Sequence, residues 1–411
     1  MILNNNTFTI QGINVGSLCE QFGTPVYVYD ASVIERQVNQ LEGAFPDLKL
    51  KLKYACKALT NTSILSLINK FGCDVDAVSP EEIQIALNAG YNINQITYTP
   101  SGISFEEFCA AIDKGIFVNL DNLVVLEKFG KKYGGTVPCS IRINPHVEAG
   151  GHEKIKTGHA ESKFGISIEQ LPEILNIVQA YNIDIKGLHV HTGSDFADID
   201  IFIKVAEVMF NAAKKFKNIR IIDFGSGFKV PYKKGDKATD VNLLGKKLTE
   251  AVKKFASEYG TEPEIWFEPG KYLVSDAGIL FVQANVVKEG PVTTFVGVNS
   301  GLNHLIRPMM YGSYHEIVNV SNAAGPVKEY SVVGYICETD TFAWNRPLNE
   351  VREGDILAIL NAGAYGFTMS SNYNSRPRPA EVLVYKGEAH LIRRRETFED
   401  IVRTEVRISF N

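Results

Sequence analysis

The sequence predicts an α/β fold in which a (β/α)8 TIM barrel is combined with a discontinuous all-β domain. Between Leu50 and Pro269, short apolar runs alternate with longer segments of helical spacing. There are eight such runs, and eight units over about 220 residues match a (β/α)8 barrel of about 250 residues. After about Ser275 the pattern changes to short alternating runs broken by Gly, Pro and Asn, which indicates β structure.

The expected barrel strands are apolar, β-branched runs that each end in a polar residue or a glycine. In chain order they read KLKYACKA, CDVDAVS, ITYTP, FVNLDN, CSIRINP, GLHVHTG, IRIIDFGSG and EIWFEPG. Because helical segments separate them, the strands are expected to be parallel and joined by right-handed crossovers. Residues 200–216 illustrate a helix, since Ile201, Val205, Met209 and Phe216 recur at helical spacing after an aspartate.

The all-β domain is expected to contain both ends of the chain. Its strand candidates after the barrel are GILFVQANVV, TTFVGVN, EYSVVGYIC and GDILAILNAG, and residues 9–30, with the strand-like TPVYVYD, could pair with that sheet. We therefore expect a barrel over residues 31–274 and a β domain made of residues 1–30 and 275–411. The stretch from Pro145 to Gly165 is longer than most βα loops, and we expect it to be a lid that is ordered only with ligand.

Composition points to a globular protein with a small-molecule partner. The chain has 411 residues, of which 45% are apolar and 22% charged, and its net charge of −5 gives no electrostatic footprint for nucleic acid or an anionic membrane. The six cysteines lie far apart without a CxxC pair, so we expect reduced thiols. No leader or membrane span is evident, and we expect a cytoplasmic protein without a metal site.

Polar residues gather where the expected strands end, which is where barrel enzymes carry their active sites. They are Lys57, Asp76, His189, His191, Gly193, Ser194, Gly225, Ser226, Gly227, Glu268, Gly270 and Lys271. Singly, each has a plainer interpretation, such as a solvated lysine, a core histidine or an ordinary glycine turn. Together they offer an amine, phosphate-binding turns, an imidazole and carboxylates, and this set suits pyridoxal 5'-phosphate.

Longer motifs add a resemblance that covers nearly the whole chain. The segments YACKALTN, HVHTGS, FEPGK, IRPMMYGSYH, CETDTF, GAYGFTMSSNYNSRPRPAEVL and RRRETFEDI closely resemble the pyridoxal-phosphate diaminopimelate decarboxylases. The resemblance implies an alanine racemase-like barrel plus β domain, and a homodimer with active sites at the interface. It also implies an enzyme of lysine biosynthesis, a carboxy-lyase that converts meso-2,6-diaminopimelate into L-lysine and carbon dioxide in the last step of the pathway.

The resemblance assigns roles around the cofactor. Lys57 looks like the Schiff-base lysine, Glu268 like the partner of the protonated pyridine nitrogen, and His191 like the residue stacked on the ring. The remaining cofactor-binding residues that it implies are Asp76 beside the lysine, and Ser194, Gly225, Ser226, Gly227, Gly270 and Tyr365.

It also assigns residues to the substrate. Cys337 and Glu338 match residues that the partner subunit supplies, and the cysteine is placed to protonate the substrate carbon. The distal carboxylate of diaminopimelate needs a cation, which suits Arg307 with Tyr311, and its distal ammonium suits Glu338. Tyr365 and Lys271 complete the expected substrate-binding set. A structural ion pair is the alternative interpretation of Arg307.

Several departures and rivals remain open. Lys271 stands where most of the family has Arg, the turn reads GSG instead of three glycines, and CETD is one residue short, so Asp340 is left unassigned. The same machinery could act on ornithine, arginine, lysine or carboxynorspermidine, or the chain could be a silent pyridoxal-phosphate-binding homologue. A metal-dependent hydrolase would need carboxylates to complete the His189–His191 pair, and no Asp or Glu at the matching strand ends completes it convincingly.

Overall fold

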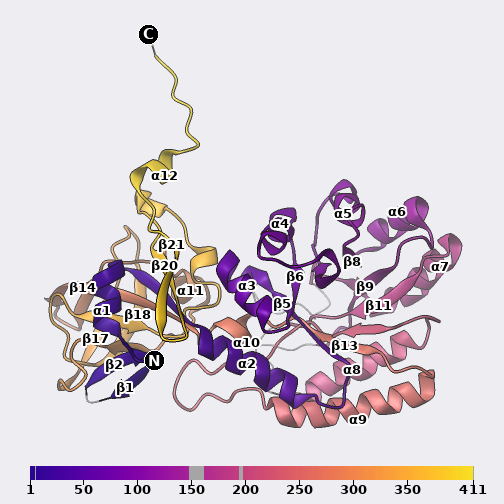
Figure 1. Cartoon of the computed structure of the whole chain (residues 1–411), viewed down its shortest axis with the longest axis horizontal. Coiled ribbons are helices and arrows are strands. Elements are labelled where there is room, and N and C mark those ends of the chain that lie inside the picture. The colour runs from indigo at the N-terminus through magenta and orange to yellow at the C-terminus, as the bar shows by residue number, and fades with distance from the viewer. Residues whose placement is uncertain (5, 148–161, 194–197, 411) are drawn as a thin grey trace. The chain divides into compact units, whose positions relative to one another are not determined.

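The computed structural model describes residues 1–4, 6–147, 162–193 and 198–410 (Figure 1). The chain divides into two compact units. The first contains Glu35–Pro231 and Asp236–Leu273, and the second contains Met1–Ile34, Tyr232–Gly235 and Val274–Asn411. Most of the expected lid, residues 148–161, lies outside the described residues, as does Ser194.

The first unit is a closed parallel barrel. Within the described residues its eight strands are β5 (Leu50–Ala55), β6 (Asp74–Ala77), β7 (Ile96–Tyr98), β8 (Phe117–Leu120), β9 (Cys139–Asn144), β11 (Ile185–His189), β12 (Ile221–Asp223) and β13 (Glu264–Phe267). Each strand pairs in parallel with its neighbours, and β13 pairs with β5 to close the barrel. A short strand, β10 (Ile166–Ser167), adds to β9. The predicted (β/α)8 barrel is therefore confirmed.

Helices alternate with these strands and surround them in Figure 1. They are α2 (Ala31–Ala44), α3 (Thr62–Lys70), α4 (Pro80–Asn88), α5 (Phe105–Ile112), α6 (Leu123–Tyr133), α7 (Leu171–Tyr181), α8 (Ile199–Ala213), α9 (Val241–Tyr259) and the short α10 (Lys271–Val274). Polar side chains begin several of them: Ser79, Ser104 and Asn122 each accept a hydrogen bond from a backbone N–H three residues later. In the described part of the chain, no helix is both long and apolar enough to cross a membrane.

The second unit is built on a mixed β-sheet in the order β18-β17-β15-β14-β4-β20-β21, to which β19 and β16 are attached through β14. The strands are β4 (Val26–Asp30), β14 (Gly278–Glu289), β15 (Thr294–Val298), β16 (Ile317–Asn319), β17 (Val327–Val333), β18 (Thr341–Asn349), β19 (Ile356–Ile359), β20 (Ala380–Tyr385) and β21 (Glu388–Arg393). Two short helices, α11 (Arg307–Tyr311) and α12 (Phe398–Val402), accompany them.

The strand β4 makes this unit discontinuous in sequence. All five of its residues are buried, and it pairs antiparallel with β14 and parallel with β20. Its Val26 and Val28 pack in one apolar core with Phe281 and Val382. The predicted discontinuous β domain is confirmed by this pairing.

The residues before β4 do not join the large sheet. They form β1 (Ile2–Asn4), β2 (Thr7–Ile10) and β3 (Ile13–Asn14), a separate three-stranded antiparallel sheet, and α1 (Val15–Phe22). Of the segment 9–30 that could have paired with the C-terminal sheet, only Val26–Asp30 does so.

Candidate active site

A lysine and a buried aspartate meet at the carboxyl ends of β5 and β6. The expected first strand was too long at its end: β5 stops at Ala55, and Lys57 lies in a 3₁₀ turn, η1 (Cys56–Ala58). Ala55 is in register with Asp76 on β6, and Lys57 Nζ lies 3.5 Å from Asp76 Oδ2. The lysine side chain is 43% exposed and the aspartate side chain only 1%. The amine is therefore open to a bound molecule, and the buried carboxylate of Asp76 lies beside it.

The Asp76 carboxyl is an unusually weak acid. Burial and the nearby charge of Glu268 raise its pKa to about 7, and Lys57 opposes that rise. Near neutral pH the Asp76 carboxyl can therefore be either protonated or ionised, whereas a carboxyl in water at pH 7 is almost fully ionised.

Glu268 follows β13 directly and faces His189, the last residue of β11. His189 Nε2 lies 3.0 Å from Glu268 Oε2, and both residues are buried. Burial by itself would raise the pKa of Glu268, but His189 and Lys57 outweigh it and hold that pKa below the usual range. The second oxygen, Oε1, is buried without a hydrogen-bond partner among the described residues. A cationic N–H group would satisfy it, which is what a protonated pyridine nitrogen offers.

His191 lies two residues beyond the end of β11 and is held by the neighbouring turn. Its Nδ1 accepts a hydrogen bond of 3.1 Å from the backbone N–H of Ser226. Burial, with the positive charges of Arg142 and Lys57, lowers the pKa of His191 to about 3. A neutral imidazole with a fixed tautomer follows, since the accepting nitrogen cannot carry the proton. Such a ring can stack on another without adding a charge.

The turn after β12 has a glycine backbone in a left-handed and crowded conformation. Gly225 and Gly227 have φ values of +62° and +130°, where glycine is favoured. A Cβ on Gly225 would lie 2.7 Å from His191 Nδ1 and from the Val190 carbonyl oxygen, so a side chain has no room there. The Gly225 N–H donates to Asp223 Oδ1 at 2.8 Å, which stabilises the turn. The N–H groups of Gly225 and Ser226 are thus bonded within the barrel unit, and the crowded glycine backbone fixes the shape of the turn.

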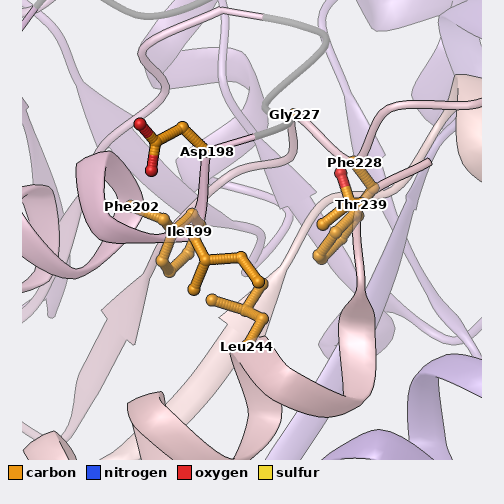
Figure 2. A pocket seen from close by; sticks show the side chains of 7 residues that line it. All are labelled: Asp198, Ile199, Phe202, Gly227, Phe228, Thr239 and Leu244. Carbon is orange, nitrogen blue, oxygen red and sulfur yellow. The ribbon is translucent and has the colours of Figure 1, made fainter. Parts of the chain in front are cut away.

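A small apolar cavity lies beside this turn, lined by Gly227 and Phe228 together with side chains of α8 and α9 (Figure 2). Its volume is about 10 Å³, room for at most one water molecule. Phe202, Ile199 and Leu244 are among the apolar side chains that line it. Apolar side chains of α8 and α9 therefore lie next to the turn, and the cavity between them is far too small to hold a cofactor.

Gly270, two residues after Glu268, packs close to the turn that carries Lys57. A Cβ on Gly270 would lie 3.2 Å from the Ala55 carbonyl oxygen and 3.2 Å from the Ala58 Cβ. Lys271 follows as the first residue of α10. The barrel unit thus brings together the expected cofactor residues Lys57, Asp76, His191, Gly225, Ser226, Gly227, Glu268 and Gly270.

Two buried charged residues were missed by the sequence analysis. Asp223 ends β12 and is 1% exposed, and Arg142 lies within β9 at 6% exposure. Burial and Glu268 raise the pKa of Asp223, whereas burial lowers that of Arg142. Each stands as a charge inside an otherwise apolar strand run, IIDF and CSIRIN, and that interruption was the available signal.

His189 has two carboxylates beside it at the strand ends. One ligand atom each from His189, Asp223 and Glu268 lies within 4.8 Å of the other two, so carboxylates do accompany this histidine at the strand ends. The register of the parallel strands aligns His189 with Asp223, although the two residues lie far apart in sequence. His191 is not a member of this cluster, so the carboxylates do not complete the expected His189–His191 pair.

In the second unit, Arg307 lies among aromatic rings. Its guanidinium carbon is 5.7 Å from the Tyr311 ring centre, 5.8 Å from Tyr365 and 5.9 Å from Tyr232. One terminal nitrogen donates to Ser313 Oγ at 3.4 Å, and Nε is buried without a partner among the described residues. No carboxylate is within salt-bridge distance of Arg307 in that part of the chain, so the structural ion pair is not found there. Tyr232 was not expected at this position.

Cys337 and Glu338 lie in the loop between β17 and β18, and both are exposed in the single chain. Tyr373 donates to Glu338 Oε1 at 2.8 Å, and Asn374 contacts Cys337. Asp340, which the sequence left unassigned, is buried and accepts hydrogen bonds from the backbone N–H groups of Leu302 and Ile336. It therefore supports the loop.

Comparison with known proteins agrees with the motifs. Residues 31–275 match the family described as pyridoxal-dependent decarboxylase, pyridoxal binding domain. The chain is 39% identical to a diaminopimelate decarboxylase of Methanothermobacter thermautotrophicus over 96% of this chain and 94% of the relative. It is 36% identical to the Bacillus subtilis diaminopimelate decarboxylase over 97% and 94% of the two chains.

A solved structure is similar along the whole length. The diaminopimelate decarboxylase of M. jannaschii in co-complex with L-lysine superimposes with a TM-score of 0.91 at 32% identity, covering 99% of this chain and 98% of that one. The resemblance drawn from the motifs is confirmed by these matches. The chain belongs to the diaminopimelate decarboxylase family of pyridoxal-dependent decarboxylases.

Proposed function

We propose that this chain is a pyridoxal-phosphate-dependent carboxy-lyase that converts meso-2,6-diaminopimelate into L-lysine and carbon dioxide, the last step of lysine biosynthesis. The observation that carries the proposal is the buried Glu268 carboxylate, with one oxygen bonded to His189 and the other without a partner among the described residues. The family membership and the L-lysine in the related M. jannaschii structure support the choice of substrate and product.

The residues at the barrel end suit each part of the cofactor. The Lys57 amine would bind the cofactor aldehyde, and His191 would offer a neutral ring beside the pyridine. The turn Gly225–Ser226–Gly227 would hold the phosphate, and the motifs assign Ser194, Gly270 and Tyr365 to the same group. When bound, pyridoxal phosphate supplies a conjugated ring that accepts the electron pair left by departing carbon dioxide.

Three side chains of this protein would hold or transfer protons around that ring. Glu268, whose pKa is held low, would hold a proton on the pyridine nitrogen and so increase the ring's capacity to accept electrons. Asp76, with a pKa of about 7, orients Lys57 and can take or return a proton at its Nζ. Cys337 delivers the proton that replaces the lost carboxylate on the substrate carbon.

Substrate selection depends on the second amino acid head of diaminopimelate. The distal carboxylate pairs with Arg307, whose Nε is available, while Tyr311 and Tyr365 border the site. The distal ammonium pairs with Glu338, which Tyr373 holds. Lys271 adds a point charge near the phosphate or the substrate. Ornithine has no distal carboxylate, so it would leave Arg307 without a partner.

The proposal includes a cytoplasmic homodimer with shared active sites. Cys337 and Glu338 are exposed on the single chain, as expected of groups that complete a site on a second subunit. The partners are then a small amino acid and a second copy of the chain, and neither nucleic acid nor membrane takes part.

The test measures carbon dioxide release by purified protein with pyridoxal phosphate. Meso-diaminopimelate is compared with L-ornithine, L-arginine and L-lysine, and Lys57→Ala serves as the control. Release from diaminopimelate alone, lost in Lys57→Ala, is the expected result. Release from another amino acid would overturn the roles of Arg307 and Glu338, and no release despite bound cofactor would identify a silent homologue.

A further inference from the structure

The side chain of Asn374 contacts Cys337 through three pairs of atoms. Its Oδ1 accepts a hydrogen bond of 3.1 Å from the Cys337 backbone N–H and lies 3.3 Å from the thiol sulfur. Its Nδ2 donates to the same sulfur at 3.0 Å. One amide group therefore binds both the main chain and the side chain of Cys337, although 37 residues separate them in sequence.

Both partners lie on segments with fixed backbones. The Cys337 loop is stabilised from within, because Asp340 Oδ2 accepts from the Ile336 N–H at 2.9 Å and the Glu338 N–H donates to the Ile336 carbonyl at 2.8 Å. Asn374 lies in a 3₁₀ turn, η6 (Tyr373–Ser375), with a φ of +56°. Asparagine tolerates this left-handed conformation better than most residues.

A thiol on an exposed loop would otherwise rotate freely about its Cα–Cβ bond. A proton donor must hold its proton within hydrogen-bonding reach of the reacting carbon, and small displacements are costly in rate. We propose that Asn374 is a positioning residue that fixes the direction of the Cys337 thiol and stabilises the thiolate left after proton transfer. This role rests on the proposed function for the part that Cys337 plays, but the contact itself does not.

The neighbouring residue provides an internal comparison. Tyr373 donates to Glu338 at 2.8 Å, so two consecutive residues of one turn hold the two candidate groups of the Cys337 loop. Glu338 is assigned to substrate binding and Cys337 to proton transfer. Tyr373→Phe should therefore raise KM, whereas loss of the Asn374 amide should lower kcat by roughly tenfold with KM within about twofold.

The direct experiment measures iodoacetamide alkylation of the holoenzyme as a function of pH. Cys337 is the exposed cysteine of the six and the other five are buried, so labelling reports one thiol, identified by peptide mass. Asn374→Asp keeps the size and the left-handed tolerance but replaces the N–H donor with a negative charge. The midpoint of its alkylation profile should rise by about one pH unit, the effect of a like charge near 3 Å in a water-like medium. Asn374→Gly should fall between Asn374→Asp and wild type.

Ser375→Gly is the matched control. Ser375 has a φ of +54° in the same turn and makes no side-chain hydrogen bond to Cys337, whose side-chain partner among the described residues is Asn374. Its variant loosens the turn without removing the amide and should keep the wild-type midpoint. Coinciding profiles for Asn374→Asp and wild type would overturn the proposal, as would equal shifts in Asn374→Gly and Ser375→Gly. Alkylation needs no turnover, so its outcome is separate from failure of the decarboxylation assay.

Discussion

His189 Nε2 and Glu268 Oε2 are 3.0 Å apart at the ends of two barrel strands, and both residues are buried. The contact commits one carboxylate oxygen to the imidazole and leaves Oε1 without a partner among the described residues. A buried charge in this state is costly unless a ligand completes its hydrogen bonding. A cofactor that offers an N–H group would therefore complete the hydrogen bonding of Glu268.

Replacing Glu268 by Gln should abolish most activity while leaving the fold intact. A neutral amide keeps the shape but cannot hold a proton on the pyridine nitrogen, and kcat should fall by about 100-fold or more. Steady-state kinetics with saturating pyridoxal phosphate would measure this. Glu264→Gln is the control, because Glu264 begins the strand that Glu268 follows and its carboxylate accepts a hydrogen bond from Trp266 Nε1. Equal activity in both variants would contradict the assigned role of Glu268.

Replacing Arg307 by Lys should weaken substrate binding more than the chemical step. The lysine keeps a charge but loses the planar fork that pairs with a carboxylate, so KM for diaminopimelate should rise by roughly 10- to 100-fold. Arg346→Lys, at an arginine 3.5 Å from the Tyr314 ring centre, is the control and should keep the wild-type KM. An unchanged KM in Arg307→Lys would remove Arg307 from the substrate site.

Replacing Asp76 by Asn should change how stability depends on pH. The pKa of Asp76 is about 7 in the folded chain against an ordinary value of 3.8. Between these values the folded state keeps a proton that the unfolded state has lost, so this residue's contribution to stability declines as pH rises toward 7. The variant's free energy of unfolding, relative to wild type, should rise by about 1–3 kcal/mol from pH 5 to pH 8. Urea unfolding of the apoproteins measures it, and parallel pH profiles would refute the shift.

Replacing Gly225 by Ala should damage the phosphate turn in two ways. The alanine would have to adopt a φ of +62°, which L residues rarely do. Its Cβ would also lie 2.7 Å from the Val190 carbonyl oxygen. Destabilisation of about 2–4 kcal/mol and lower cofactor occupancy after dialysis should follow. Gly235→Ala separates the two causes, because Gly235 has a φ of +88° but nothing within 4 Å of its would-be Cβ. Its expected cost is about 1 kcal/mol. Equal costs in the two variants would show that the contact with Val190 does not matter.

The barrel could be predicted from the sequence because buried parallel strands form short apolar runs that differ clearly from amphipathic helices. The residues at which the strands end could not be predicted. The run KLKYACKA continues to Ala58, whereas β5 stops at Ala55 and η1 begins at Cys56. Nothing in the spacing separates a last strand residue from a first turn residue, although this decides which way Lys57 points.

The candidate site could be predicted where residues stand at strand ends and not where tertiary contacts create them. Arg142 and Asp223 lie inside apolar runs, and only closure of the barrel places their charges near Glu268. The Asn374 contact with Cys337 joins two loops and follows no periodic pattern. A sequence motif marks such residues without revealing what they touch.

The central place of β4 has a consequence for synthesis on the ribosome. Val26 emerges early but pairs with Phe281 and Ala380, and β4 is complete only when both neighbours exist. The barrel residues, which end at Leu273, leave the ribosome before either neighbour. The first unit can therefore fold during translation, whereas β4 must wait with its apolar side chains unpaired until nearly all of the chain has been made.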